Sequence, residues 1–303
     1  MRKIFINSNS QVRSGWKIII TLAASCIMIF TSVITVSLIC MILSKVIPPP
    51  FLTAISKVST SKVGIQFAIN ILTEASMIFS VILFWRLFDK KPLSGMGLIS
   101  LRYGYKDLRT GLILGIISMS LVFVIILKMG NVILEKELLK PTTLFPLFTG
   151  FILFIVAGIS EELFSRGYCI EVLKQTGKTS IAVLVSSLVF TALHLGNKNI
   201  SFLAIFNVFL AGILFSNMYL KTGSIWLSTG YHIMWNFFEG TIFGFQVSGL
   251  YVNGLYKVKN VTNNYINGGQ FGPEGGIVVT IIITLGFLYL WKFYKPGNSN
   301  LQG

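Results

Sequence analysis

The sequence predicts an all-α polytopic membrane protein with about eight transmembrane helices. Of the 303 residues, 53% are hydrophobic and only 12% are charged, about half the charged fraction of soluble domains. The mean hydropathy is +0.77, and apolar stretches of bilayer-spanning length recur along the chain. These values exclude a disordered chain, a collagen-like repeat and a disulfide scaffold.

Eight segments are predicted to span the bilayer, because a hydrocarbon core of ~30 Å needs about 20 helical residues. The run at 110–128 is short for a span, and the long run at 147–174 is interrupted by charges. Tight connections at 198–200 and 221–224 predict antiparallel helix pairs. The predicted spans are residues 18–43, 63–87, 110–128, 147–174, 179–197, 201–220, 224–245 and 276–294.

The first apolar segment follows a basic N-terminal region, as in a secretory signal peptide. The stretch from Ile18 to Leu43 is longer than the apolar region of such a peptide, however. It ends at Lys45 and a run of prolines, Pro48–Pro50, with no small-residue cleavage site. We therefore expect a retained first transmembrane helix.

The net charge of +15 arises from 25 Lys and Arg against 10 Asp and Glu. Such a charge can indicate nucleic-acid binding, but in so apolar a chain it indicates membrane topology and contact with anionic lipid. With a cytoplasmic N-terminus, 15 basic residues lie inside and 9 outside. This ratio favours cytoplasmic N- and C-termini, with the basic segment 86–109 at the cytoplasmic surface. We expect the bilayer as a partner and no nucleic acid.

The three cysteines, Cys26, Cys40 and Cys169, lie in apolar stretches and form no CxxC pair. We therefore expect neither a disulfide nor a thiolate metal site.

Ionisable residues inside the predicted spans are candidates for function, because a charge in hydrocarbon costs ~3 kcal/mol or more and has to be compensated. Both histidines of the chain belong to this set. Its members are Glu74, Glu161, Glu162, Arg166, His194, His232 and Glu239.

Two of these carboxylates lie near the middle of the predicted span 147–174. Glu162 and Arg166 are four residues apart, so they share a helix face and can pair. Pairing leaves the carboxylate of Glu161, about 100° around the helix, available as a general base. The alternative interpretation is that this charged stretch is a helix end at the cytoplasmic surface.

The histidines each have a partner four residues away: Phe190 precedes His194, and Asn236 follows His232. A histidine near a helix end is more often structural than a ligand. The His232–Asn236 pair offers two hydrogen-bond donors to a cavity, or it joins helices to one another. Glu239 lies on the same face as this pair, nearer the external end.

A carboxylate base combined with histidine and asparagine donors suits the hydrolysis of an amide. The sequence contains neither GxSxG nor HExxH. Two histidines cannot supply a three-histidine zinc site, whereas a zinc site of two histidines and one carboxylate is possible. Its ligands would be Glu161, His194 and His232.

Three motifs on successive predicted helices resemble the CPBP family of intramembrane proteases, which includes type II CAAX prenyl proteases and bacteriocin-processing Abi proteases. The resemblance covers about residues 146–295, whereas the earlier helices match only in number and hydrophobicity. The stretches 223–226 and 268–275 also resemble bacterial members. The three motifs are Glu161-Glu162-x-x-x-Arg166, Phe190-x-x-x-His194 and His232-x-x-x-Asn236.

The resemblance implies a role for each motif residue, within an active site inside the helix bundle. Glu161 is expected to activate water, and His194 to position the water or to act as an acid. The oxyanion site is assigned to His232 and Asn236, with Glu162 and Arg166 in support. Family members are described both as metalloproteases and as metal-free glutamate proteases. Two scattered histidines and a paired Glu162 favour the metal-free form, so no cofactor is expected and zinc stays an alternative.

We therefore expect an intramembrane endopeptidase that hydrolyses membrane-associated peptides or proteins. Its expected location is a bacterial cell membrane, and its role is the maturation of peptides or bacteriocins, or immunity. One alternative is a non-catalytic regulator or scaffold of another envelope protein, against which the intact motifs argue. Another is a proton-coupled transporter, which predicts repeated halves, whereas the charges here cluster in the second half.

The predicted domain organisation has three parts. Residues 1–145 hold the N-terminal helices and the basic loop, 146–295 the protease core, and 296–303 a short tail. Glu74 shares a helix face with Gln66 and Asn70 and fits no motif. For Glu74, a polar contact between helices is favoured over a place in the cavity.

Overall fold

The computed structural model describes residues 2–7, 9–46, 62–135, 144–252 and 254–295. The run Pro48–Pro50, the counted lysines Lys57, Lys136 and Lys140, and the predicted tail 296–303 lie outside these residues. The described part is mainly helical, with one small two-stranded sheet, which confirms an all-α membrane protein. It divides into two compact units, Met1–Lys91 and Pro92–Gly303, which we describe separately.

The N-terminal unit consists mainly of two long helices that pack along each other, α2 (Ser14–Val46) and α4 (Lys62–Phe84). A short helix, α1 (Arg2–Phe5), precedes them, and the π-helical segment η1 (Trp85–Asp89) continues α4. The Lys17 ammonium lies 2.6 Å from an oxygen of Asp89, so a largely buried ion pair joins the start of α2 to the end of η1. Glu74 lies on α4, and its assignment stays a prediction.

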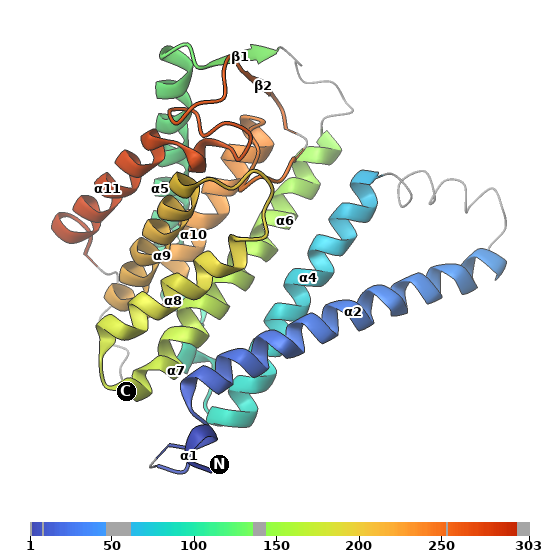
Figure 1. Ribbon diagram of the computed structural model, residues 1–303, viewed down its shortest axis with the longest axis vertical. Helices are drawn as coiled ribbons and strands as arrows, with labels where there is room; N and C mark the ends of the chain where they lie inside the picture. Colours follow the sequence, from blue (N-terminus) through green and yellow to red (C-terminus); the bar gives the residue numbers. More distant parts are fainter. Residues whose placement is uncertain (1, 8, 47–61, 136–143, 253, 296–303) are drawn as a thin grey trace. The chain divides into compact units, whose positions relative to one another are not determined.

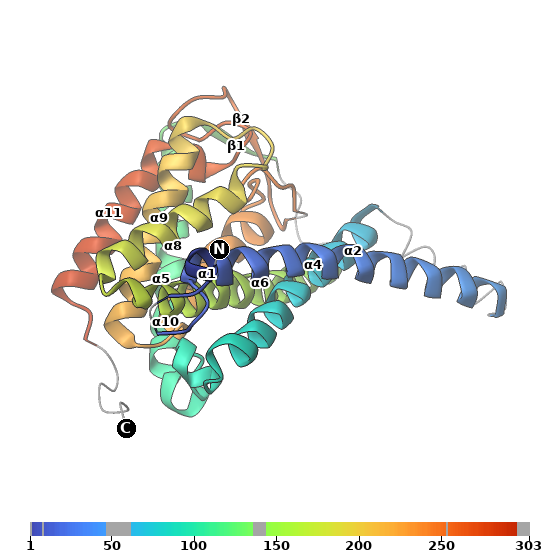
Figure 2. The same cartoon turned by 60° about the horizontal axis from the view of Figure 1, so that its bottom comes forward.

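The second unit is a helix bundle whose central helix is α10 (Trp226–Asn236). Figures 1 and 2 show α10 lying along α5 and between α6 and α9, and the contacts between these helices agree. The other helices of the bundle are α5 (Leu101–Lys128), α6 (Leu144–Glu162), α8 (Thr179–His194), α9 (Phe202–Thr222) and α11 (Ile277–Lys292).

All eight predicted segments are helical, but the predicted number of spans is wrong. Among the described residues, five helices are long and apolar enough to cross a membrane. Helices α8 and α11 have 16 residues each, which gives a rise of about 24 Å against a ~30 Å core. The third helix that is not among these five, α10, is interrupted by polar residues, among them Ser228, Thr229 and His232.

The helix predicted at 110–128 begins earlier than expected, at Leu101. The Ser100 side chain accepts a hydrogen bond from the backbone N–H of Arg102, which caps the helix start. The basic side chains of the first turns are exposed, whereas Gly104 and Asp107 are buried. Part of the predicted basic surface segment 86–109 is therefore the start of α5.

Helices α5 and α10 approach each other closely because glycines lie at their interface. A β-carbon on Gly111 would lie 2.1 Å from the carbonyl oxygen of Leu227, and one on Gly115 would lie 2.4 Å from that of Tyr231. Gly230 faces the opposite way, and its β-carbon would lie 2.5 Å from the carbonyl oxygen of Leu108. Backbone therefore packs against backbone along this pair of helices.

A tight turn reverses the chain between α9 and α10, as predicted. Gly223 ends α9 with φ of 66°, a left-handed conformation that glycine adopts without strain. The Thr222 hydroxyl accepts a hydrogen bond from the backbone N–H of Ser224. This turn places the start of α10 beside the end of α9.

A two-stranded ribbon, which the sequence analysis did not predict, lies at one end of the bundle (Figure 1). Strand β1 (Val132–Glu135) pairs antiparallel with β2 (Lys257–Asn260), with Val132 opposite Asn260. The Asn264 side-chain amide donates to Asn131 Oδ1 at 2.6 Å, which ties the loop after α10 to the end of α5.

We predict that Gly111→Ala lowers the thermal stability of the protein in detergent. The added methyl group would collide with backbone, which has little freedom to move, and overpacking of this kind costs about 1–3 kcal/mol. The control is Gly196→Ala, because a β-carbon there meets nothing within 4 Å. Melting temperatures are measured by tryptophan fluorescence. If the two variants melt at the same temperature, the close packing of α5 against α10 does not contribute to stability.

Candidate active site

The predicted carboxylates lie inside a helix that continues well beyond them. After α6 ends at Glu162, the chain runs on through η4 (Leu163–Ile170), α7 (Glu171–Leu173) and η5 (Lys174–Thr176). Glu162 and Arg166 are fully buried. The interpretation of this stretch as a helix end at the surface is therefore wrong.

The carboxylate of Glu162 joins two cationic or polar partners at the centre of the bundle. Its Oε1 lies 2.9 Å from a guanidinium nitrogen of Arg166 and 3.1 Å from Nδ1 of His232. The spacing of four residues predicted the first contact, and the second links α6 to α10. Because an ionised carboxylate only accepts hydrogen bonds, Nδ1 of His232 carries the hydrogen.

Aromatic rings and a backbone carbonyl complete the surroundings of Arg166. Its guanidinium carbon lies 4.2 Å from the ring centre of Phe190 and 5.1 Å from that of Phe215, within the range of cation–π attraction. The guanidinium also donates to the carbonyl oxygen of Gly212 at 3.3 Å. Phe215 in turn lies 5.3 Å from the ring centre of His232, so it packs against both partners of the Glu162 carboxylate.

Glu161 faces both histidines at equal distance. Its Oε2 lies 3.9 Å from Nε2 of His194 and 3.9 Å from Nε2 of His232. These distances are too long for direct hydrogen bonds, and a water that contacts all three atoms would have to lie to one side of the lines that join them. The side chain of Glu161 is 25% exposed and that of His194 15%, but the Glu161 Oε2 atom that faces the histidines is itself buried and has no hydrogen-bond partner among the described residues.

The tautomer of His194 follows from its backbone contact. Its Nδ1 lies 2.8 Å from the carbonyl oxygen of Phe190. Since a carbonyl cannot donate, Nδ1 carries the hydrogen, and Nε2 of the neutral ring presents a lone pair toward Glu161. The Phe190-x-x-x-His194 spacing therefore fixes the ring through the backbone of Phe190.

Asn236 lies one turn beyond His232 on α10 and is 8% exposed. Its side chain takes no part in the contacts described above, which join Glu161, Glu162, Arg166, His194 and His232. The π-helical segment η6 (Phe237–Ile242) begins directly after it, as η4 begins after Glu162. Wider helical turns of this kind occur often at functional sites.

The fit to a metal ion is poor. Among the described residues, no three histidine, cysteine, aspartate or glutamate side chains are grouped as a metal site would require. Glu162, the nearest further carboxylate, is already engaged with Arg166 and His232.

Glu239 lies on η6, three residues beyond Asn236. It is fully buried, and the loop residue Gly272 covers it, since a β-carbon there would lie 3.3 Å from Glu239 Oε1. Close by, Trp235 donates its indole N–H to Glu274 at 3.3 Å, and the Ser248 hydroxyl donates to the same carboxylate. The sequence analysis missed Glu274, because a long irregular loop separates it from α10.

Comparison with known families identifies the segment that carries the motifs. Residues 143–238 match the model of the type II CAAX prenyl endopeptidase Rce1-like family. The match contains all three motifs and ends before the glycine-rich stretch 268–275. No curated protein and no solved structure matches the chain. Residues 143–238, which carry all three motifs, are therefore similar to the Rce1-like family and support an intramembrane protease of the CPBP type.

Proposed function

We propose that this protein is an intramembrane endopeptidase that hydrolyses peptide bonds with water activated by Glu161. The family match supports an intramembrane protease of the CAAX type in general. The observation that carries the finer assignment is the position of Glu161 Oε2, 3.9 Å from Nε2 of both His194 and His232.

A water molecule between these three atoms would have a partner for each of its hydrogens. One hydrogen bonds to the Glu161 carboxylate, and the other to the lone pair on Nε2 of His194. A lone pair of the water oxygen is then free to attack the carbonyl carbon of the peptide. As the C–O bond forms, Glu161 accepts a proton and becomes a carboxylic acid.

The oxyanion that forms in this step needs donors. Nδ1 of His232 donates to Glu162, so Nε2 of His232 can donate only when the ring is an imidazolium. The ionised Glu162 carboxylate stabilises the positive charge of the imidazolium. Arg166 is a second cation beside the same carboxylate. We assign the other donor to the amide of Asn236.

Collapse of the tetrahedral intermediate completes the reaction. The C–N bond breaks, and Glu161 returns its proton to the leaving amine. The products are a carboxylic acid and an amine, and Glu161 is again ionised. The water is consumed and no redox step is required.

The burial of the cluster within apolar helices favours substrates that reach it from the membrane, namely membrane-associated peptides or membrane-anchored proteins. A place in a bacterial cell membrane, with both termini cytoplasmic, and a role in peptide or bacteriocin maturation or in immunity remain part of the proposal.

We predict that Glu161→Gln lowers the hydrolysis rate by about 10²–10⁴-fold, because an amide cannot accept the proton from water. The measurement uses the full chain in proteoliposomes and a panel of fluorogenic membrane-anchored peptides that includes a prenylated CAAX peptide. The matched control is Glu171→Gln, a carboxylate of the same long helix that pairs with Lys174. Substantial hydrolysis by Glu161→Gln would refute the assignment. Wild-type protein that cleaves none of the peptides would favour a regulatory role.

We also predict that stability and activity respond differently to loss of the buried pair. Arg166→Met leaves Glu162 buried without its main counter-charge, which costs about 3–5 kcal/mol. The double variant Glu162→Leu/Arg166→Met removes both charges and should recover most of that stability. It should stay inactive, because His232 loses its acceptor. Thermal unfolding and hydrolysis are measured on the same samples, and an active double variant would exclude the role given to Glu162.

Removal of divalent metals should leave the rate unchanged. The three candidate ligands are not grouped as a metal site, and the proposed steps use only protein groups and water. The test is dialysis against EDTA and 1,10-phenanthroline, followed by hydrolysis with and without added zinc. Loss of activity that zinc restores would replace the proposed mechanism with metal-assisted hydrolysis.

A further inference from the structure

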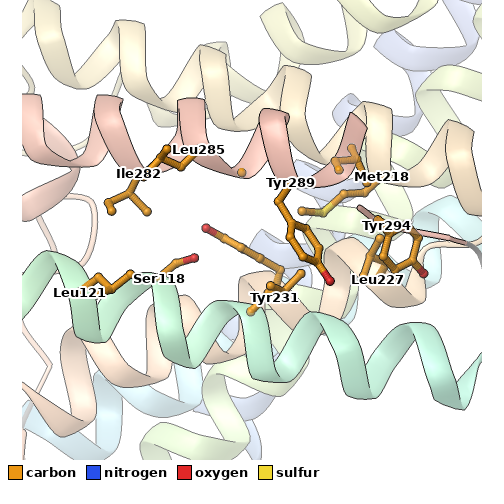
Figure 3. A pocket seen from close by; sticks show the side chains of 12 residues that line it. Ser118, Leu121, Met218, Leu227, Tyr231, Ile282, Leu285, Tyr289 and Tyr294 are labelled. Carbon is orange, nitrogen blue, oxygen red and sulfur yellow. The ribbon is translucent and has the colours of Figure 1, made fainter. Parts of the chain in front are cut away.

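A cavity of about 140 Å³ lies among α5, α9, α10 and α11 (Figure 3). None of its lining residues belongs to the cluster around Glu161. Most of them are apolar, and the exceptions are hydroxyl groups, of which those of Ser118 and Tyr231 point toward each other in Figure 3. A space of this composition accommodates hydrocarbon better than water, which needs several polar partners.

The cavity reaches the outer apolar surface between α5 and α11. Two of its lining residues, Leu121 on α5 and Leu285 on α11, are 46% and 50% exposed. The neighbouring side chains Ile117, Ile281 and Leu288 are also about half exposed. In a membrane this surface faces lipid chains, so a chain can enter the cavity from the side.

One end of the cavity carries positive charge. The Lys221 ammonium donates to the carbonyl oxygen of Leu290 and lies 5.9 Å from the ring centre of Tyr294, and both residues line the cavity. Lys292 and Lys295 on either side of Tyr294 are exposed. The acidic group at this end, Asp107, accepts a hydrogen bond from the Tyr294 hydroxyl at 2.5 Å.

Exposed aromatic residues mark the same end as a membrane interface. Trp291 is 81% exposed and Phe293 63% exposed. Tryptophan and other aromatic side chains beside lysines are typical of the level of the lipid headgroups. The apolar cavity therefore lies at the depth of acyl chains, and the lysines lie at the depth of phosphates.

We propose that this cavity binds an acyl-chain segment of one anionic glycerophospholipid, with its phosphate held by Lys221, Lys292 and Lys295. The apolar walls select a hydrocarbon chain, and the lysines select an anionic over a zwitterionic headgroup. This lipid site does not depend on the proposed proteolytic function.

Native mass spectrometry of the delipidated full chain tests the proposal. The protein is titrated with phosphatidylglycerol and with phosphatidylcholine that carry the same palmitoyl and oleoyl chains. We expect one tightly retained phosphatidylglycerol. Ser118→Phe should weaken its binding at least about tenfold, because the ring fills the cavity. The matched control Ile113→Phe, at an exposed position of α5 that does not line the cavity, should bind as the wild type does.

The lysines are tested separately. Lys292→Gln/Lys295→Gln should reduce the preference for phosphatidylglycerol by about fivefold per lysine, whereas Lys128→Gln at the other end of α5 should not. Equal retention of the two lipids by the wild type, or unchanged binding by Ser118→Phe, would overturn the proposal.

A measurement on unaltered protein covers the case in which Ser118→Phe fails to fold. Phosphatidylglycerol with a photoreactive group in one chain should label peptides of α5 and α11 around Ser118 and Ile282, and excess unlabelled phosphatidylglycerol should prevent this. Labelling spread evenly over the lipid-facing helices would contradict the proposal. So would labelling that a farnesylated peptide prevents and phosphatidylglycerol does not, since the cavity would then hold substrate.

Discussion

The buried carboxylate of Glu162 is the interaction on which the candidate site depends. It lies on α6, pairs with Arg166 one turn further along, and accepts a hydrogen bond from His232 on α10. Arg166 extends the connection to α9 through the carbonyl oxygen of Gly212. A charge in this environment is tolerated only while its partners stay in place. The requirement fixes these three helices in one register, and that register holds Glu161 opposite His232.

Close packing of α10 makes this arrangement possible. Glycines on α5 and α10 let the two backbones touch, and the left-handed Gly223 turns the chain directly from α9 into α10. Beyond the other end of α10, the ribbon β1–β2 and Asn264 tie the following loop to the end of α5. The helix that supplies His232 and Asn236 is thus held at both ends and along its length.

The spacing of residues along one helix predicted part of the site, whereas contacts between residues far apart in the sequence were seen only in the structure. The pairing of Glu162 with Arg166 follows from their separation of four residues. The partner of Glu162 on α10, His232, lies 70 residues away. The resemblance placed both residues in one active site but did not predict their contact. The true start of α5 was hidden because basic side chains on its exposed face lower the average hydropathy of the segment. Glu274 was missed because irregular loops carry no periodic signal.

The short helix α8 has a consequence for the membrane around the site. Its 16 residues end at His194, and the connection that follows is polar, with Asn197, Lys198 and Asn199. A bilayer of ordinary thickness has to thin here, or else bury these polar groups below the headgroups. Thinning of the bilayer around α8 would bring the hydrated headgroup region toward His194. The mismatch in length thus places this histidine at the polar end of a helix that is too short to cross the hydrocarbon core.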